Sequence, residues 1–252
     1  MADCRIVTVF AAKGGCGKTT VATNLATVLH DRGAYRVCLL DLDLEFGDAA
    51  SVLGLRPERS MVDALVMDRL TPATVASLMT NYLPGFDCLL APTRPGEARL
   101  IPAALVSRLL AVLPIAYDFV VVDTPSHFTP HVLAALDAAD HQILVTTPER
   151  PALKNLRGTL DMLDLLPYDR AARSIVINRS DPGSDLPDEF LDALVRSPIA
   201  GRLPAWDDVP ASINRGEPLA AAQPDHAVSL AIRQLAAALL QDGRCSRDPP
   251  TG

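Results

Sequence analysis

The stretch that decides the fold is Lys13-Gly14-Gly15-Cys16-Gly17-Lys18-Thr19-Thr20. An apolar run over Arg5–Ala11 (RIVTVFA) precedes it, and residues with helical spacing over Lys18–Arg32 follow it. A glycine-rich turn between a strand and a helix lets backbone N–H groups converge on phosphate oxygens, and the helix N-terminus adds a favourable dipole. The sequence therefore predicts a phosphate-binding loop at this position.

The side chains of this loop match the needs of a magnesium nucleotide. Lys18 is expected to neutralise the β- and γ-phosphates, the Thr19 hydroxyl to bind Mg²⁺, and Thr20 to contact the α-phosphate. The residues expected to contact the nucleotide in this loop are Gly14, Gly15, Cys16, Gly17, Lys18, Thr19 and Thr20. Ala12 replaces the first glycine of G-x-x-x-x-G-K-[ST], and a glycine-rich turn without a ligand is the less favoured alternative. A dinucleotide is not expected, because no G-x-G-x-x-G is present.

Short apolar runs alternate with helical patterns along the rest of the chain. The runs are almost continuously apolar, which is typical of parallel strands covered on both faces. The predicted strands, besides the first, are Arg36–Asp41, Asp87–Ala91, Asp118–Asp123, His141–Thr146 and Arg173–Asn178. The predicted helices, besides the first, cover about residues 60–80, 101–113, 129–139, 150–166, 187–196 and 225–241, and Pro204 and Pro210 enclose a loop. This alternation predicts an α/β fold with a doubly wound, mainly parallel sheet and helices on both faces. We expect a single domain over residues 1–241 and a disordered tail over 242–252.

Composition narrows the class of protein. The chain has 252 residues, of which 49% are hydrophobic, but no apolar run reaches the roughly 18 residues of a membrane-spanning helix. The N-terminus lacks the pattern of a secretory signal, so a cytoplasmic protein is expected. Five scattered cysteines form neither a C-x-x-C pair nor a zinc spacing. The net charge of −7 argues against a protein that coats DNA.

Carboxylates follow two of the predicted strands. Asp41 and Asp43 are two residues apart, so they lie on one side of a strand at its carboxyl end, where ligands bind in open α/β sheets. The run Tyr117–Pro125 (YDFVVVDTP) is an apolar strand that ends in Asp123, and this Walker B pattern predicts a carboxylate that holds a Mg²⁺-bound water. For Asp41 and Asp43, the alternative to ligand binding is a structural role in which the two side chains only cap the segment that follows the strand.

The motif K-G-G-x-G-K-T-T, with a second lysine five residues before the P-loop lysine, resembles the deviant Walker A motif of the ParA/MinD superfamily. The resemblance implies a P-loop ATPase that binds ATP and Mg²⁺ and forms an ATP-dependent homodimer. It implies that Lys13 reaches across the dimer interface to the partner's phosphates and that Asp43 orients the attacking water. Lys13, Lys18 and Asp43 are thus the predicted catalytic residues.

The same resemblance extends to the metal and the base. It places Asp41 near the metal shell, so Thr19, Asp41 and Asp123 are the predicted magnesium residues, the aspartates through water. Asn178 and Arg179 resemble the family's N-R step, in which the asparagine amide reads the edge of adenine. Pro204 begins the loop expected to complete the base pocket, over Pro204–Asp208.

Looser segments resemble the CpaE/TadZ pilus-assembly branch, above all Ile213–Leu219 (INRGEPL). This implies a protein partner in a pilus, secretion or positioning system, which could recruit the chain to a cell pole or membrane complex. Residues 225–241 hold one basic residue, Arg233, so a membrane-binding helix like that of MinD is not expected. Arg150, Lys154 and Arg157 share a helix face, and a solvated face is favoured there over DNA or partner binding.

Other functions remain open on the same residues. A ParA-like partition ATPase and a MinD-like positioning ATPase are alternatives to the pilus role. A small-molecule ligase or kinase is a third class, but the sequence shows no signature of an acceptor pocket. An iron–sulfur carrier is not expected, because no cysteine lies between Cys88 and Cys245.

Overall fold

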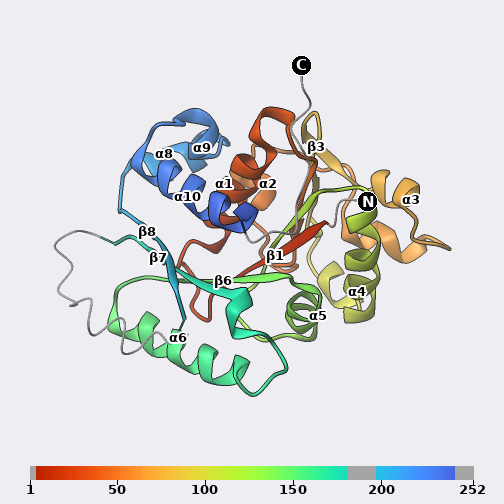
Figure 1. Cartoon of the computed structure of the whole chain (residues 1–252). Helices are drawn as coiled ribbons and strands as arrows, with labels where there is room; N and C mark the ends of the chain where they lie inside the picture. The colour runs from red at the N-terminus through yellow and green to blue at the C-terminus, as the bar shows by residue number, and fades with distance from the viewer. Residues whose placement is uncertain (1–3, 181–196, 242–252) are drawn as a thin grey trace.

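The computed structural model describes residues 4–180 and 197–241, and within these ranges an eight-stranded sheet has the order β3-β4-β2-β5-β1-β6-β7-β8 (Figure 1). The strands are β1 (Arg5–Phe10), β2 (Val37–Asp41), β3 (Thr80–Leu83), β4 (Phe86–Leu89), β5 (Phe119–Asp123), β6 (His141–Thr146), β7 (Arg173–Asn178) and β8 (Ile199–Leu203). Neighbouring strands run parallel except β3 and β4, which pair antiparallel. The predicted doubly wound, mainly parallel sheet is confirmed.

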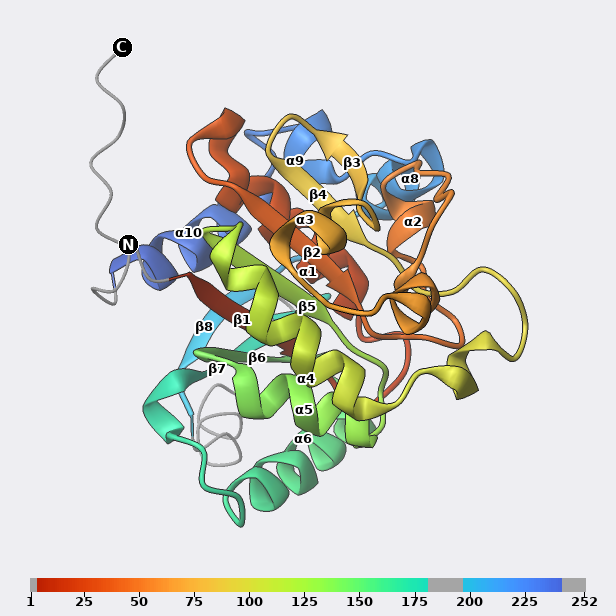
Figure 2. The same cartoon turned by 90° about the vertical axis from the view of Figure 1, so that its right-hand side faces the viewer.

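Helices cover both faces of this sheet (Figures 1 and 2). On one face α1 (Lys18–His30) and α10 (Ala227–Gln241) share a core with inward side chains such as Val9 and Val121. On the other face lie α4 (Ala103–Val112), α5 (Pro130–Ala138) and α6 (Arg150–Leu163). The shorter helices are α2 (Ala49–Val52), α3 (Pro72–Ala76), α8 (Asp208–Arg215) and α9 (Leu219–Ala222).

Burial on both faces explains the continuous apolar runs of the sequence. Every residue of β1, β2, β5 and β6 is buried. The register places Asp123 beside Val9 on one side and beside Asp41 on the other. The carboxyl ends of the three central strands therefore meet at one edge of the sheet, next to the N-terminus of α1.

The helix predicted over residues 60–80 was wrong for most of its length. That segment contains a 3-10 helix over Met61–Val66, the five-residue α3 and the start of β3 at Thr80. β3 and β4 form a hairpin around Pro84 and Gly85, and Gly85 has a φ of 87°. Proline followed by glycine is a turn signal, so the sequence did contain evidence for this hairpin.

The C-terminal third also differs from the prediction. β8 was not predicted, because its residues are mostly half-buried and carry no strong apolar pattern. The loop predicted between Pro204 and Pro210 ends earlier, since α8 begins at Asp208 and accommodates Pro210 in its first turn. The helix predicted over 187–196 and the tail over 242–252 lie outside the described residues. Within the two described ranges, none of the helices has the length and apolar character needed to cross a bilayer.

Candidate functional site

The glycine-rich loop lies between β1 and α1, where the sequence predicted it. Gly15 and Gly17 have φ angles of 76° and 92°, in the left-handed region that favours glycine. A Cβ at Gly17 would lie 2.3 Å from Nδ2 of Asn178, so the close approach of β7 to the loop also requires a glycine there. Gly14 and Gly15 are exposed at the tip of the loop.

Two side chains at the start of α1 bind to the segment after β5. Lys18 is only 8% exposed, and its Nζ donates a hydrogen bond to Oγ of Ser126 at 2.7 Å. The Thr19 hydroxyl donates to Oδ2 of Asp123 at 2.6 Å. A buried ammonium, a hydroxyl and a carboxylate therefore converge at the carboxyl edge of the central strands.

Asp123 is a buried carboxyl in an unusual electrostatic setting. Burial raises its pKa from the ordinary 3.8 to about 7, although the Thr19 hydroxyl and the Lys18 ammonium both act to lower it. Its Oδ1 is buried and has no hydrogen-bond partner among the described residues. An unpartnered carboxylate oxygen at this place fits a bound cation or an ordered water.

Asp41 lies beside Asp123 across the β2–β5 pair. Its Oδ1 accepts a hydrogen bond from the backbone N–H of Asp43 at 3.0 Å, and its Oδ2 accepts one from Ala49 at 3.3 Å. Burial, together with the charge of Asp123, raises the pKa of Asp41 well above its ordinary value. Asp41 thus accepts hydrogen bonds from the backbone of the segment that follows β2, which is the capping role given above as the alternative. Its position next to Asp123 also places it near the predicted metal site. The half-buried Asp43 is close enough to raise the pKa of both other aspartates.

The residues at this edge fit a magnesium ion bound together with phosphates. Thr19, Asp41 and Asp123 are all oxygen donors, and one oxygen of Asp123 is unpartnered. No cluster of three or more His, Cys, Asp or Glu side chains in residues 4–180 and 197–241 could hold a metal by itself. Magnesium commonly binds through one or two carboxylates, water and substrate phosphates rather than in an all-protein cage, so this set suits it.

A second region of the site is an open pocket of about 610 Å³ beyond the glycine loop. This volume lies within the usual range for small-molecule sites. The pocket brings the predicted residues Gly17, Thr20, Asn178, Arg179 and Pro204 together with residues of α8 and the loop before it. It therefore joins the end of β7 to the loop after β8.

Asn178 is held in place at the inner wall of this pocket. Its Nδ2 donates to the backbone carbonyl of Cys16 at 2.8 Å, and its Oδ1 accepts from the backbone N–H of Arg179 at 3.0 Å. The amide retains a second N–H and a second oxygen lone pair, which is one donor and one acceptor. That pattern matches the N7 acceptor and the N6 amino donor of adenine.

Lys13 lies on the other side of the loop, partly exposed. Its Nζ is 4.0 Å from Oε2 of Glu149, and the side chains are 41% and 54% exposed. The pKa of Glu149 is lowered by a hydrogen bond from the Thr147 hydroxyl and further by the charges of Lys13 and Arg179. Lys13 is therefore available at the surface rather than bonded within the phosphate site.

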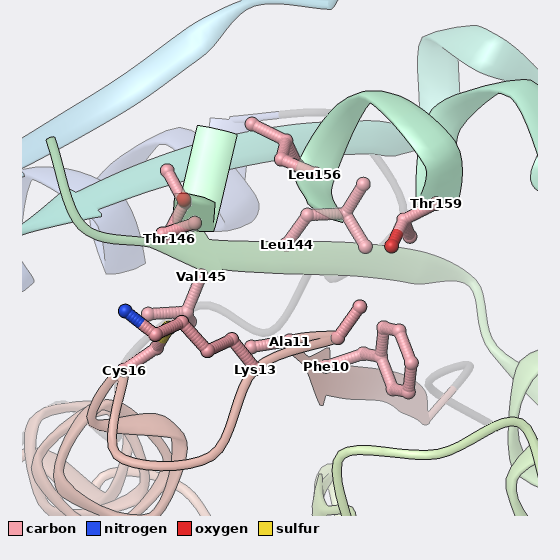
Figure 3. Close-up of a pocket in the computed structure, with 11 residues that line it drawn as sticks. Phe10, Ala11, Lys13, Cys16, Leu144, Val145, Thr146, Leu156 and Thr159 are labelled. Carbon is pink, nitrogen blue, oxygen red and sulfur yellow. The ribbon is translucent and has the colours of Figure 1, made fainter. Parts of the chain in front are cut away.

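A small cavity behind the loop is separate from the open pocket. It is lined by Phe10, Cys16 and Lys13 on one side and by β6 and α6 on the other (Figure 3). At about 10 Å³ it has room for at most about one water molecule. Cys16 is buried, in keeping with a small residue tolerated at this position of the loop.

The structure adds two residues that were not among the predicted site residues, Ser126 and Trp206. Ser126 lies three residues after the Walker B aspartate Asp123. Its position in the sequence could therefore have predicted that it lies close to the glycine loop. Trp206 lines the open pocket and is the one tryptophan in the chain, in the loop expected to complete it. On α6, Arg157 pairs with Asp161 at 3.1 Å, and Arg150 and Lys154 are exposed, which fits a solvated face.

The family model for the CobQ/CobB/MinD/ParA nucleotide binding domain matches residues 7–219 of this chain. The chain belongs to this family. The match spans the glycine loop, all three aspartates and the loop after β8. The ParA/MinD resemblance of the motifs is therefore confirmed at the level of this family, and nucleotide binding is the property that the family shares.

Individual relatives are similar over most of the chain. The septum site-determining protein MinD of Thermotoga maritima is 26% identical over 221 residues, covering 85% of this chain and 80% of that protein. The chromosome-partitioning ATPase Soj of Thermus thermophilus is 35% identical over 153 residues, covering 60% of this chain and 58% of that protein. Neither is a CpaE or TadZ protein.

Solved structures share the fold. A ParA family ATPase from Chlorobium tepidum has a TM-score of 0.87 and 24% identity, covering 92% of this chain and 98% of that chain. MinD from Pyrococcus horikoshii, complexed with Mg-ADP, has a TM-score of 0.82 and 22% identity, covering 94% and 96%. These likenesses confirm the expected architecture.

Proposed function

We propose that the chain binds Mg-ATP at the carboxyl edge of its sheet and hydrolyses it slowly, as a molecular switch. The observation that carries this proposal is the cluster of Lys18, Thr19 and Asp123, in which Thr19 bonds to Asp123 and Lys18 to Ser126, next to an open pocket of about 610 Å³. The cluster offers a cation, a hydroxyl and a carboxylate to a triphosphate and its metal, and the pocket is large enough for a nucleoside. The Mg-ADP bound by the MinD of Pyrococcus horikoshii supports this assignment.

Each group has a separate task in this proposal. The backbone of the glycine loop and the Lys18 ammonium bind the phosphates, with Lys18 leaving Ser126 to do so. Thr19 and Asp123 would hold a magnesium ion, with Asp41 behind them, and a bound ion would supply neutralisation of the charge that develops on the phosphates. Asp43 orients the water that attacks the γ-phosphate. Asn178 binds the base edge, and Pro204 belongs to the opposite wall.

ATP also controls association of two copies in this proposal. The exposed Lys13 is positioned to leave Glu149, since a surface ion pair contributes only about 0–1 kcal/mol. It then contacts the phosphates held by a second copy, so two chains close face to face over two nucleotides. A second cation spreads the charge of the triphosphate only when both copies meet. Loss of the γ-phosphate removes these contacts, and the dimer opens.

Light scattering after size exclusion tests the switch. Asp43→Ala is expected to accumulate as a dimer with Mg-ATP, because nucleotide binding remains while hydrolysis stops. Lys13→Ala is expected to bind Mg-ATP and stay monomeric. A Lys13→Ala chain that dimerises in Mg-ATP as the wild type does would remove the cross-subunit role.

For the cellular role, we propose that the switch organises a protein partner in pilus or secretion assembly. The segments that resemble the CpaE/TadZ branch, above all Ile213–Leu219, support this role. MinD-like positioning and ParA-like partition of DNA are the alternatives, supported by the MinD and Soj relatives. The MinD of Aquifex aeolicus, whose fold this chain shares, has been solved in a complex with MinC. That MinD therefore has a protein partner.

Two measurements separate these roles. An ATP-dependent, salt-sensitive shift in the electrophoretic mobility of non-specific duplex DNA would support the partition role. The absence of such a shift would favour the role with a protein partner. ATPase turnover without any added metabolite supports the switch. Strict dependence of turnover on a small-molecule acceptor would instead support a ligase or kinase.

A further inference from the structure

The tryptophan of this chain stands in an unusual place. Trp206 is 51% exposed, although it is the largest apolar side chain that the sequence has. It is not scattered on an open surface, because it lines the pocket that also holds Asn178 and Thr20. A large aromatic ring left half-exposed inside a pocket indicates a ligand that covers it.

The indole of Trp206 packs against His226, which belongs to a small network of polar side chains. Its ring meets the imidazole of His226 edge to face, with centroids 5.4 Å apart and an interplanar angle of 80°. His226 accepts a hydrogen bond at Nδ1 from the backbone N–H of Val228 at 3.2 Å, and its Nε2 lies 3.7 Å from Oδ2 of Asp208. The Gln223 amide donates to Oδ1 of the same aspartate at 3.3 Å. The imidazole thus lies between α8 and α10, and the indole packs against it.

The walls of the pocket differ in chemistry. Asn178 offers one free donor and one free acceptor, whereas Trp206 offers an aromatic surface. Thr20 and Gly17, from the glycine loop, lie between these walls and the phosphate site. A flat heteroaromatic ring with hydrogen-bonding groups on one edge satisfies both walls, because its face can stack on the indole while its edge bonds to the Asn178 amide.

We propose that Trp206 stacks on the base of the bound nucleotide and supplies base affinity that does not depend on which purine is bound, while Asn178 reads the base edge. The inference rests on the proposed function, because the phosphates of the same nucleotide occupy the glycine loop. Stacking acts on the aromatic face that adenine and guanine share, so Trp206 strengthens ATP and GTP binding alike. Discrimination between them is left to Asn178.

The test uses the wild-type chain, Trp206→Ala and Trp206→Phe, with Mg-ATP, Mg-GTP and inorganic tripolyphosphate with magnesium as probes. Calorimetry is expected to show that Trp206→Ala weakens ATP and GTP binding equally, by roughly ten- to a hundred-fold. Tripolyphosphate binding is expected to stay within twofold, and Trp206→Phe to retain most of the affinity. Since the ring is half-exposed, both variants should keep the wild-type circular dichroism spectrum.

Fluorescence gives a second readout without any mutation, because the chain has one tryptophan. Mg-ATP is expected to quench the emission of the indole, and tripolyphosphate to leave it unchanged. Unaltered emission at saturating ATP, together with Trp206→Ala binding ATP as tightly as the wild type, would overturn the inference and leave the proposed function standing. Failure of the wild type to bind either ATP or tripolyphosphate would overturn the proposed function and this inference with it.

Discussion

The phosphate half and the base half of the site are built differently. In the phosphate half, Asp41 and Asp123 are buried at the ends of central strands, Lys18 is buried at the start of α1, and hydrogen bonds join all three to neighbours. In the base half, Arg179 and Trp206 are exposed and the walls come from segments at the edge of the sheet. We therefore expect the buried, pre-positioned charged groups to provide most of the free energy of nucleotide binding, and the open pocket to adjust affinity and selectivity.

The largest expected effect lies in the phosphate half. Lys18→Ala should weaken Mg-ATP binding by more than about a hundred-fold, because it removes the buried ammonium group that is proposed to bind the phosphates. Isothermal titration calorimetry measures this loss. Lys154→Ala, which removes an exposed lysine on α6, is the matched control and should bind ATP as the wild type does. Equal affinities for the two variants would contradict the proposed division of the site.

The buried aspartates should make the magnesium-free chain sensitive to pH. The pKa of Asp123 is raised to about 7 in the folded chain, so folding favours its protonated form. The free energy of unfolding should therefore be greatest near pH 4 and fall as the pH rises towards 8, by an amount on the order of 2–4 kcal/mol from this group. Urea denaturation in EDTA at several pH values measures the trend.

Asp123→Asn is the control for this pH effect, since an amide has no charge to lose. Its free energy of unfolding should vary less with pH than that of the wild type. Mg²⁺ added together with ATP should restore part of the wild-type stability at high pH, because the cation favours the ionised carboxylate. A wild-type stability that rises steadily between pH 4 and pH 8 in EDTA would argue against a carboxyl of raised pKa.

Gly17 is where the two halves meet, so its substitution should affect both. Gly17→Ala puts a side chain on a residue with a φ of 92° and a Cβ 2.3 Å from Nδ2 of Asn178. The expected cost is roughly 1–3 kcal/mol of stability, with weaker binding of ATP. Thermal denaturation and calorimetry measure the two effects.

Gly14→Ala is the matched control within the same loop. Gly14 has no positive φ, and a Cβ there would meet nothing within 4 Å. The free energy of unfolding of the Gly14→Ala variant should differ from that of the wild type by less than about 0.5 kcal/mol. Equal destabilisation by the two substitutions would mean that the approach of Asn178 to the loop does not constrain Gly17.

The smallest expected effect concerns the exposed ion pair of Lys13. Glu149→Gln should change the affinity of the monomer for ATP by less than about twofold, because both side chains are about half-exposed and solvent screens them. The comparison with the wild type is made by calorimetry on dilute protein, at concentrations where the chain stays monomeric, so that dimer formation does not contribute. A tenfold change would show that Glu149 acts on the phosphate half directly.

The difference between the halves also decides what the sequence could predict. The phosphate half comes from one contiguous loop and from Asp123 at the end of an apolar strand, and these features are local patterns. The register that brings Asp41 next to Asp123 follows from the parallel order of strands in this fold class. Buried central strands carry a strong apolar signal, so most of the sheet was predictable.

The base half was predictable only through the family resemblance. β8 is half-exposed at the edge and lacks an apolar pattern, and α8 begins within residues that read as a proline loop. The packing of Trp206 against His226 joins positions that no local pattern connects. The hairpin at Pro84 and Gly85 was missed for another reason, because its turn signal was outweighed by the apolar residues before it.

The central claim is that the buried groups of the phosphate half grip a triphosphate. Calorimetry with magnesium and three ligands, namely ATP, tripolyphosphate and adenosine, tests it most directly on one preparation of folded wild-type protein. The account predicts saturable binding of one ATP per chain, retained binding of tripolyphosphate, and adenosine binding weaker than that of ATP by more than about a hundred-fold. Adenosine binding as tightly as ATP, or an absence of heat with ATP, would contradict it.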